Sequence, residues 1–445
     1  MKNTGKILVC LGITVLFFVP LSSIESAVVV IHGHGLDDTA GALDGGWLEE
    51  RNGVKILHLS GSYYEMGYQH GRLLGDEIHI LMRIMLDFFA DAGFTYASLL
   101  DRWNVMKPYV PERYIAEMQG IADGAGVTAE EICILNTLHD TANFLSCCGA
   151  IMWGAATADG SLIHLRSGDL SIFLHDPETG TYMQELQAII VHNPDDAYAS
   201  LSPMWIGCVG SYGGFNEKGI GVSETTCWTG DTTLHGACAG FRMGLALDTA
   251  DSGTEAIDIM EADRTCGWDL FVSDANVPEG YVLEQTANAS RICRCDDASE
   301  STPPFWMITD VLRRPNCFIH PDMAALQREH YDIGDLRSML RLVTGQDSYF
   351  AIWKHYVALS KGIERVWGTM DVNNTMMMFQ DFYRGNNDVL FFLLQKLYFY
   401  MPIQQWVACP QTGDMAICFA SRDKIASYNP VHYFNLFELL EAEPP

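Results

Sequence analysis

Residues 146–169 read SCCGAIMWGAATADGSLIHLRSGD, and this stretch predicts more about the chain than any other. Two strand-like runs lie on either side of the turn Asp159-Gly160. An Asp-Gly pair between two such runs is a good signal for a β-hairpin. The hairpin would bring Arg166 and Asp169, on the returning strand, close to Cys147 at its start.

A cation and a carboxylate beside a cysteine can serve nucleophilic catalysis. The positive charge of Arg166 lowers the pKa of a neighbouring thiol, and Asp169 can hold an amine or imidazole in place. A buried structural cysteine with a surface Arg/Asp pair explains the same spacing. These residues alone therefore leave both interpretations open.

The composition excludes several classes of protein. The chain has 445 residues, of which 48% are hydrophobic and 19% charged, so it is far too apolar for a disordered protein. Its 56 acidic residues against 27 basic ones give a formal net charge of −29. Such a field repels phosphate, so we expect neither nucleic-acid binding nor tight docking on anionic lipid.

Residues 1–27 have the pattern of an export signal. Lys2 and Lys6 precede the apolar residues 7–21, a stretch that is short for a membrane span. Polar residues and Ala27 follow it. We expect a secreted, periplasmic or cell-surface protein that contacts a membrane only through this segment, if the segment stays uncleaved.

The part of the chain between this signal and the adjacent cysteines Cys147 and Cys148 is expected to be mainly helical. The alternating residues 54–61 predict one strand before the helices begin. Ser62 with Glu65, and Thr128 with Glu131, form capping-box patterns that predict two helix starts.

Beyond the cysteine pair, strand patterns alternate with helical ones, which favours an α+β sandwich over a parallel doubly wound sheet. The expected helices span residues 254–263 and 335–344. The expected strands span residues 182–192, 206–208, 220–223, 281–284, 375–379, 404–409 and 415–419.

The quoted stretch resembles the start of the mature chain in N-terminal-nucleophile hydrolases of the penicillin acyltransferase type. The spacing to Trp153 and Gly160 fits Cys147 and misses Cys148 by one residue, so Cys148 is the weaker alternative. The matching positions are Cys147, Trp153, Gly154, Ala156, Thr157, Asp159, Gly160, Arg166 and Asp169. Three positions depart from the family pattern. Ser146 stands where the family often has Gly, Cys148 where Ser or Thr is usual, and Ser167 where Asn is usual.

Residues 59–71, 213–222 and 316–321 are similar to further blocks of the same family. The resemblance implies a four-layer αββα N-terminal-nucleophile hydrolase sandwich over residues 147–445. A helical propeptide over residues 28–146 would precede it. Whether the propeptide stays bound as a subunit after cleavage is left open.

The resemblance also implies a mechanism. The thiol of Cys147 would attack the carbonyl of Ser146, and cleavage would free the α-amine of Cys147, so that one residue supplies nucleophile and base. Asp169 would orient the amine or thiol, Arg166 would lower the thiol pKa or stabilise charge, and Asn316 would donate to the oxyanion. Further candidates for contact with the oxyanion or the substrate are Thr226 and Arg328.

We therefore expect an amidase or acyltransferase for a small-molecule amide or acyl substrate, with no cofactor and no metal. The pair Cys293-x-Cys295 lacks the repeated spacing of a zinc site. Disulfide pairing of Cys227, Cys238, Cys293 or Cys295 and single buried cysteines are equal alternatives. Two rival functions stay open: a phospholipase B-like amidase, and an exported binding protein that keeps the fold without the chemistry.

Overall fold

The computed structural model describes residues 45–141, 146–327, 336–344, 349–398 and 401–444. The expected export signal over residues 1–27 and the candidate Arg328 lie outside the described residues. Among the helices that are described, none is both long and apolar enough to cross a membrane.

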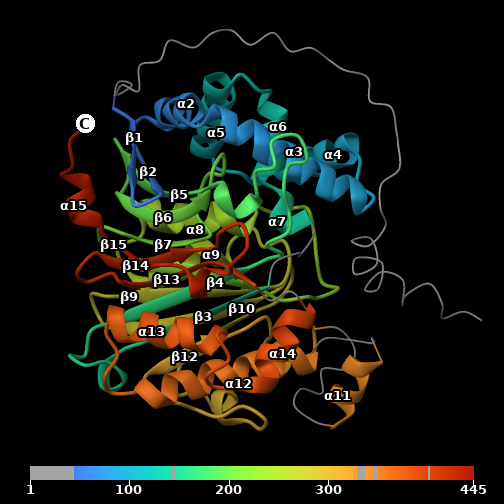
Figure 1. The fold of residues 1–445 in the computed structure, drawn as a ribbon, viewed down its shortest axis with the longest axis vertical. Helices are drawn as coiled ribbons and strands as arrows, with labels where there is room; N and C mark the ends of the chain where they lie inside the picture. Colours follow the sequence, from blue (N-terminus) through green and yellow to red (C-terminus); the bar gives the residue numbers. More distant parts are fainter. Residues whose placement is uncertain (1–44, 142–145, 328–335, 345–348, 399–400, 445) are drawn as a thin grey trace, which may run out of the picture.

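Two β-sheets form the centre of the molecule (Figure 1). One has nine strands in the order β1-β2-β5-β6-β7-β8-β9-β10-β11, and the other has six in the order β12-β3-β4-β13-β14-β15. The strands are β1 Trp47–Arg51, β2 Val54–Gly61, β3 Ser146–Met152, β4 Ile163–Asp169, β5 Gln187–Pro194, β6 Ser200–Trp205, β7 Gly213–Asn216, β8 Ile220–Thr226, β9 Trp268–Asp274, β10 Glu279–Gln285, β11 Ser290–Cys293, β12 Val311–Arg314, β13 Pro402–Cys409, β14 Asp414–Phe419 and β15 His432–Asn435.

Helices cover the outer faces of both sheets, and the inner faces pack against each other (Figure 1). Helices α2, α8 and α9 contact the nine-stranded sheet, while α12 and α13 contact the six-stranded sheet. The expected four-layer αββα sandwich is therefore confirmed. The helices are α2 Tyr63–Leu73, α3 Gly75–Asp91, α4 Tyr96–Met106, α5 Glu112–Ala125, α6 Ala129–Leu135, α7 Leu138–Thr141, α8 Ala239–Thr249, α9 Gly253–Glu261, α10 Pro321–Ala324, α11 Leu336–Val343, α12 Tyr349–Val366, α13 Val372–Tyr383, α14 Val389–Tyr398 and α15 Leu436–Leu440.

The core between the sheets consists of apolar side chains from both. Ile56 and Phe215 of the nine-stranded sheet pack against Trp406 and Ile417 of the other, and all four are buried. Because each sheet also carries helices on its outer face, strands such as β8 are buried on both sides. A polar side chain in such a strand therefore needs a partner inside the protein.

Most local predictions are confirmed, including both capping boxes. Two strand predictions are wrong, and a third, over residues 182–192, holds only from Gln187, because Met183–Glu185 form a 3-10 helix. Residues 375–379 lie inside helix α13, because Met378, Phe379 and Phe382 recur at helical spacing on one buried face while Met377 is exposed. Residues 206–208 follow strand β6 and form no strand, because that strand ends at Trp205.

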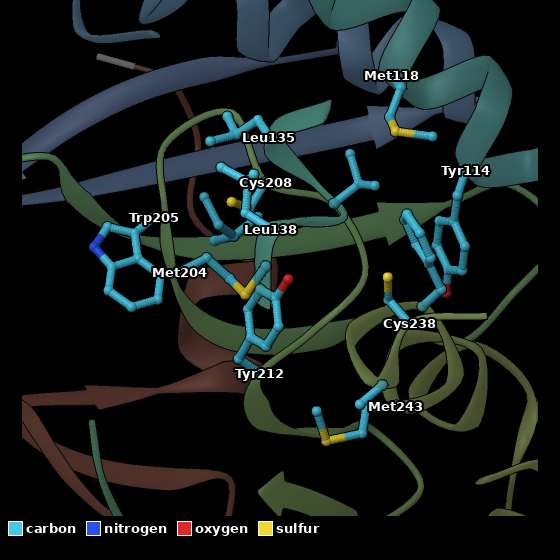
Figure 2. Close-up of a cluster of buried hydrophobic side chains, with 14 of the residues drawn as sticks. Tyr114, Met118, Leu135, Leu138, Met204, Trp205, Cys208, Tyr212, Cys238 and Met243 are labelled. Atoms are coloured by element: carbon cyan, nitrogen blue, oxygen red, sulfur yellow. The ribbon is translucent and has the colours of Figure 1, made fainter. Parts of the chain in front are cut away.

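The residues before Cys147 are built into the sandwich. Strand β2 pairs in parallel with β5, so the upstream segment supplies two strands as well as helices. Helices α2 and α5 touch backbone to backbone, and a Cβ added to Gly67 or Gly120 would collide with a carbonyl of the other helix. Figure 2 shows Leu135 and Leu138 from the upstream helices in one cluster with side chains of the downstream chain.

The twelve cysteines of the described residues are all free thiols, and all but Cys295 are buried. The disulfide alternative for Cys227, Cys238, Cys293 and Cys295 is therefore not realised here. Buried thiols act as small apolar side chains, which agrees with their place in the core clusters.

Candidate active site

The expected hairpin is formed by strands β3 and β4. Cys147 pairs with Gly168, and Ser146 pairs with Asp169. Successive side chains of a strand point to opposite faces, so Cys147 and Cys148 face different layers. The thiol of Cys147 packs in the cluster of the nine-stranded sheet, and that of Cys148 packs among the helices behind the six-stranded sheet.

The thiol of Cys147 lies between a buried arginine and a buried glutamate. Arg166 Nη2 donates to Cys147 Sγ at 3.7 Å, and the thiol lies 4.0 Å from Glu224 Oε1. Arg166 and Glu224 also form an ion pair with each other. Gln404 accepts a further hydrogen bond from Arg166 Nη1 at 3.3 Å. Glu224 and Gln404 thus both hold the guanidinium of Arg166 beside the sulfur.

Glu224 is a site residue that the sequence motifs did not predict. It lies one residue beyond the strand predicted over residues 220–223, in the part by which β8 extends to Thr226, and every residue of β8 is buried. A carboxylate in a strand that is buried on both faces is a detectable signal, because it must find a cationic partner. The sequence alone does not identify that partner as Arg166.

Burial holds the thiol of Cys147 in its neutral form. It raises the pKa of Cys147 well above its ordinary value, and Glu224 adds to the rise while Arg166 opposes it. Burial likewise raises the pKa of Asp169 to about 7, although hydrogen bonds from Tyr383 and Ser167 and the charge of Arg166 lower it.

Asn316 contacts both residues of the expected cleavage site. Its Oδ1 accepts hydrogen bonds from the N–H of Cys147 at 3.1 Å and from the hydroxyl of Ser146 at 2.7 Å. Its Nδ2 donates to the carbonyl oxygen of Thr226 at 2.9 Å. The hydroxyl of Thr226 is buried and, within the described part of the chain, has no hydrogen-bond partner.

The carboxylate of Asp169 lies on the face of the hairpin opposite the thiol. Its Oδ2 accepts from Tyr383, while its buried Oδ1 has no hydrogen-bond partner among the described residues. Asp169 is the cross-strand neighbour of Ser146, and its backbone also hydrogen-bonds the thiol of Cys147. Its expected role, to orient the amine or the thiol, stays a prediction.

The site is closed in this structure. A cavity of about 10 Å³ lies beside Arg166 and is lined in part by Trp205, Tyr212 and Gln404. That volume holds about one water molecule. The ring of His139 in α7, just upstream of the hairpin, stacks on Trp205 and lies 4.1 Å from the ring centre of Tyr212. Across the described residues, no group of three or more potential metal ligands is present.

The fold and this geometry define an αββα sandwich whose central hairpin holds a buried cysteine between an arginine, a glutamate and an asparagine. No family model matches the chain. An uncharacterized protein of Archaeoglobus fulgidus is 25% identical over 356 residues, which cover 72% of this chain and 56% of that protein. Protein dcd1B of Dictyostelium discoideum is 24% identical over 274 residues, or 55% of this chain and 53% of that protein. The chain thus spans about half the length of the curated relatives it matches.

The solved structures that match this chain share little sequence with it. An N-acylethanolamine-hydrolyzing acid amidase ortholog from Caenorhabditis elegans gives a TM-score of 0.38 at 12% identity, over 59% of this chain and 93% of that one. Penicillin V acylase from Agrobacterium tumefaciens gives 0.37 at 11% identity, over 66% and 87%. A mutant of conjugated bile acid hydrolase from Clostridium perfringens gives 0.35 at 11% identity, over 66% and 93%.

Proposed function

We propose that this chain is a self-cleaving cysteine amidase or acyltransferase of the N-terminal-nucleophile type, with Cys147 as the nucleophile. One observation carries the proposal. The thiol of Cys147 lies beside Arg166 and Glu224, and the amide of Asn316 holds both Ser146 and the N–H of Cys147. These contacts surround a single peptide bond and would help to cleave it, whereas a purely structural cysteine would not need them.

The first reaction is an acyl shift within the chain. The sulfur of Cys147 attacks the carbonyl carbon of Ser146, the C–N bond breaks, and a thioester forms. The thiol proton moves to the departing nitrogen. Water then hydrolyses the thioester, which leaves a carboxylate on Ser146 and restores the free thiol of Cys147. The hydrogen bond to Asn316 fixes the backbone nitrogen of Cys147 in place before the C–N bond breaks.

The second reaction uses the new N-terminus. A free α-amine has a reference pKa of about 8 and can therefore accept the thiol proton near neutral pH. The unpartnered Oδ1 of Asp169 supports its role as the group that orients this amine. Arg166 stabilises the thiolate, and Asn316 is the candidate oxyanion donor once its bond to Thr226 is exchanged.

The substrate class we propose is a small-molecule amide, with the acyl group passed from Cys147 to water or to an amine. The pairing of β2 with β5 supports retention of residues 28–146 as a bound subunit after cleavage. Export by residues 1–27 stays a prediction from the sequence.

Intact-mass measurement and N-terminal sequencing of the purified protein test this proposal. We expect two fragments, the second beginning at Cys147. Cys147→Ala should give one uncleaved chain, and the matched control Cys148→Ala should process normally. A wild-type chain that stays intact favours the rival of a binding protein without the chemistry. Normal processing of Cys147→Ala would exclude Cys147 as the autolytic nucleophile.

A further inference from the structure

We propose that Tyr383, in the helical layer behind the six-stranded sheet, is a positioning residue that fixes one oxygen of the Asp169 carboxyl by a hydrogen bond, favours its ionised form, and leaves the other oxygen for the nitrogen of Cys147. This inference rests on the proposed function, which assigns Asp169 to that nitrogen. It adds a residue that lies 214 positions away from Asp169 in the sequence.

The hydroxyl of Tyr383 is the centre of a buried polar cluster. It lies 2.7 Å from Asp169 Oδ2, 2.5 Å from Ser167 Oγ, 3.4 Å from Cys148 Sγ and 3.2 Å from His355 Nε2. All five side chains are buried, and helices α12 and α13 supply His355 and Tyr383.

The direction of these hydrogen bonds follows from the number of protons available. A phenol has one proton and two lone pairs, and an ionised carboxylate only accepts. Tyr383 therefore donates to an ionised Asp169, and its oxygen is left to accept from His355, while the single proton of Ser167 can be accepted by either Tyr383 or Asp169. Burial lowers the pKa of His355 to about 3, so the ring is neutral and its Nε2–H tautomer fits the role of donor.

The geometry leaves Asp169 with one oxygen held and one free. Tyr383 occupies Oδ2, and Oδ1 has no hydrogen-bond partner in the described chain. The hydrogen bond from Tyr383 restricts rotation of the carboxylate, and Asp169 is the cross-strand neighbour of Ser146, so the free Oδ1 is the atom assigned to the nitrogen that cleavage exposes on Cys147. The charge of Arg166 acts on the carboxylate, the carboxylate in turn acts on the thiols of Cys147 and Cys148, and of these two thiols only that of Cys148 lies on the same face of the hairpin.

A donor to the ionised form of a carboxyl lowers its pKa. Removing the Tyr383 hydroxyl should therefore raise the pKa of Asp169 and leave less carboxylate near neutral pH. A hydrogen bond to a charged group is large enough to move that pKa by about one unit or more. Any step that needs ionised Asp169 should then lose rate at low pH and recover it at high pH.

The experiment compares Tyr383→Phe with the wild-type chain in two measurements. The first is the rate of self-cleavage of precursor from cell-free translation, over a pH range of about 5 to 9, because ionised Asp169 would also hold the nitrogen of Cys147 as it leaves and gains a proton. We expect the acid limb of the variant to move up by about one pH unit, with a roughly tenfold loss of rate below the midpoint and near wild-type rates above it. The matched control is Tyr356→Phe, which removes another buried hydroxyl from α12 that bonds Arg313 instead, and its profile should not move.

The second measurement does not depend on cleavage. In a Cys147→Ala background, the carboxyl ¹³C resonance of Asp169 is assigned by its loss in Asp169→Asn and titrated with and without Tyr383→Phe. A higher midpoint in the variant supports the inference, and an unchanged midpoint overturns it. A rate loss that is equal at every pH also overturns it, since that is the mark of a merely structural role.

The two measurements separate the two possible failures. If the wild-type chain does not cleave, the proposed function fails while the titration still decides whether Tyr383 acts on Asp169. If Tyr383→Phe does not fold, as judged by near-UV circular dichroism, Ser167→Ala replaces it. That variant removes a second hydroxyl that lowers the pKa of Asp169, and its midpoint should also rise.

Discussion

Replacing Glu224 with glutamine removes one buried negative charge from the surroundings of Cys147 and keeps the shape of the side chain. In the structure Oε1 lies 4.0 Å from the sulfur. Two unit charges at that distance interact by about 4 kcal/mol at an effective dielectric constant of about 20, which corresponds to about three pKa units. A negative charge destabilises the thiolate, so its removal lowers the pKa of Cys147. Arg166 stays beside the sulfur and acts in the same direction. We expect the pKa of Cys147 to fall by about one to three units.

The same change should cost stability, because it leaves the buried guanidinium of Arg166 without its counter-charge. Breaking a buried ion pair costs about 3–5 kcal/mol, and the amide oxygen of glutamine keeps one acceptor, so we expect a loss near the lower end. The matched control is Glu300→Gln, which breaks the buried pair with Arg314 away from the thiol. This control should lower the free energy of unfolding without changing the pKa of Cys147.

The assay is the ultraviolet absorbance of the Cys147 thiolate as a function of pH, taken as the difference from the same chain with Cys147→Ala. This readout does not require a reagent to reach the buried sulfur. Urea unfolding of the same samples reports stability. A midpoint for Glu224→Gln that is equal to or higher than that of the wild type would refute the electrostatic account of the site.

Two further predictions concern the upstream segment. Gly67→Ala should destabilise the protein by about 3 kcal/mol, because the added methyl group collides with the carbonyl of Glu117. In the control Gly75→Ala the added methyl group meets only ordinary contacts. The midpoints of urea unfolding of the two variants are compared with that of the wild type. Burial is the largest single influence on the pKa of His192 and lowers it, but the charge and hydrogen bond of Glu117 together with the charge of Asp248 outweigh burial, so the net shift is upward. The stability that this pair adds is therefore complete below about pH 6.5 and is lost as pH rises through the folded pKa. The stability difference between the wild type and His192→Gln, measured by urea unfolding at several pH values, should shrink in that direction.

The predictions that held depend on residues close together in the chain. The capping box of Ser62 and Glu65 formed as expected, and so did the hairpin, although residues 153–162, including a short 3-10 helix over Gly154–Ala156, join its strands rather than a tight turn at Asp159-Gly160. The hairpin then brought Arg166 to within 3.7 Å of the Cys147 thiol. The strand expected over residues 375–379 failed because a run of methionines fits a buried strand or a buried helix face equally well, and packing against the six-stranded sheet selects the helix.

The sequence by itself determined the hairpin, the helix caps and the pairing of Cys147 with Arg166, since hydrogen bonds and turns within about twenty residues depend on the local chain. Only the tertiary structure decided that Glu224 neutralises Arg166, that Asn316 holds the Ser146–Cys147 peptide, and that Tyr383 binds Asp169. Those partners are separated by 58, 169 and 214 residues respectively. A buried polar group requires a partner, but which one it meets depends on how two sheets and their helices stack, and no spacing in the sequence specifies that.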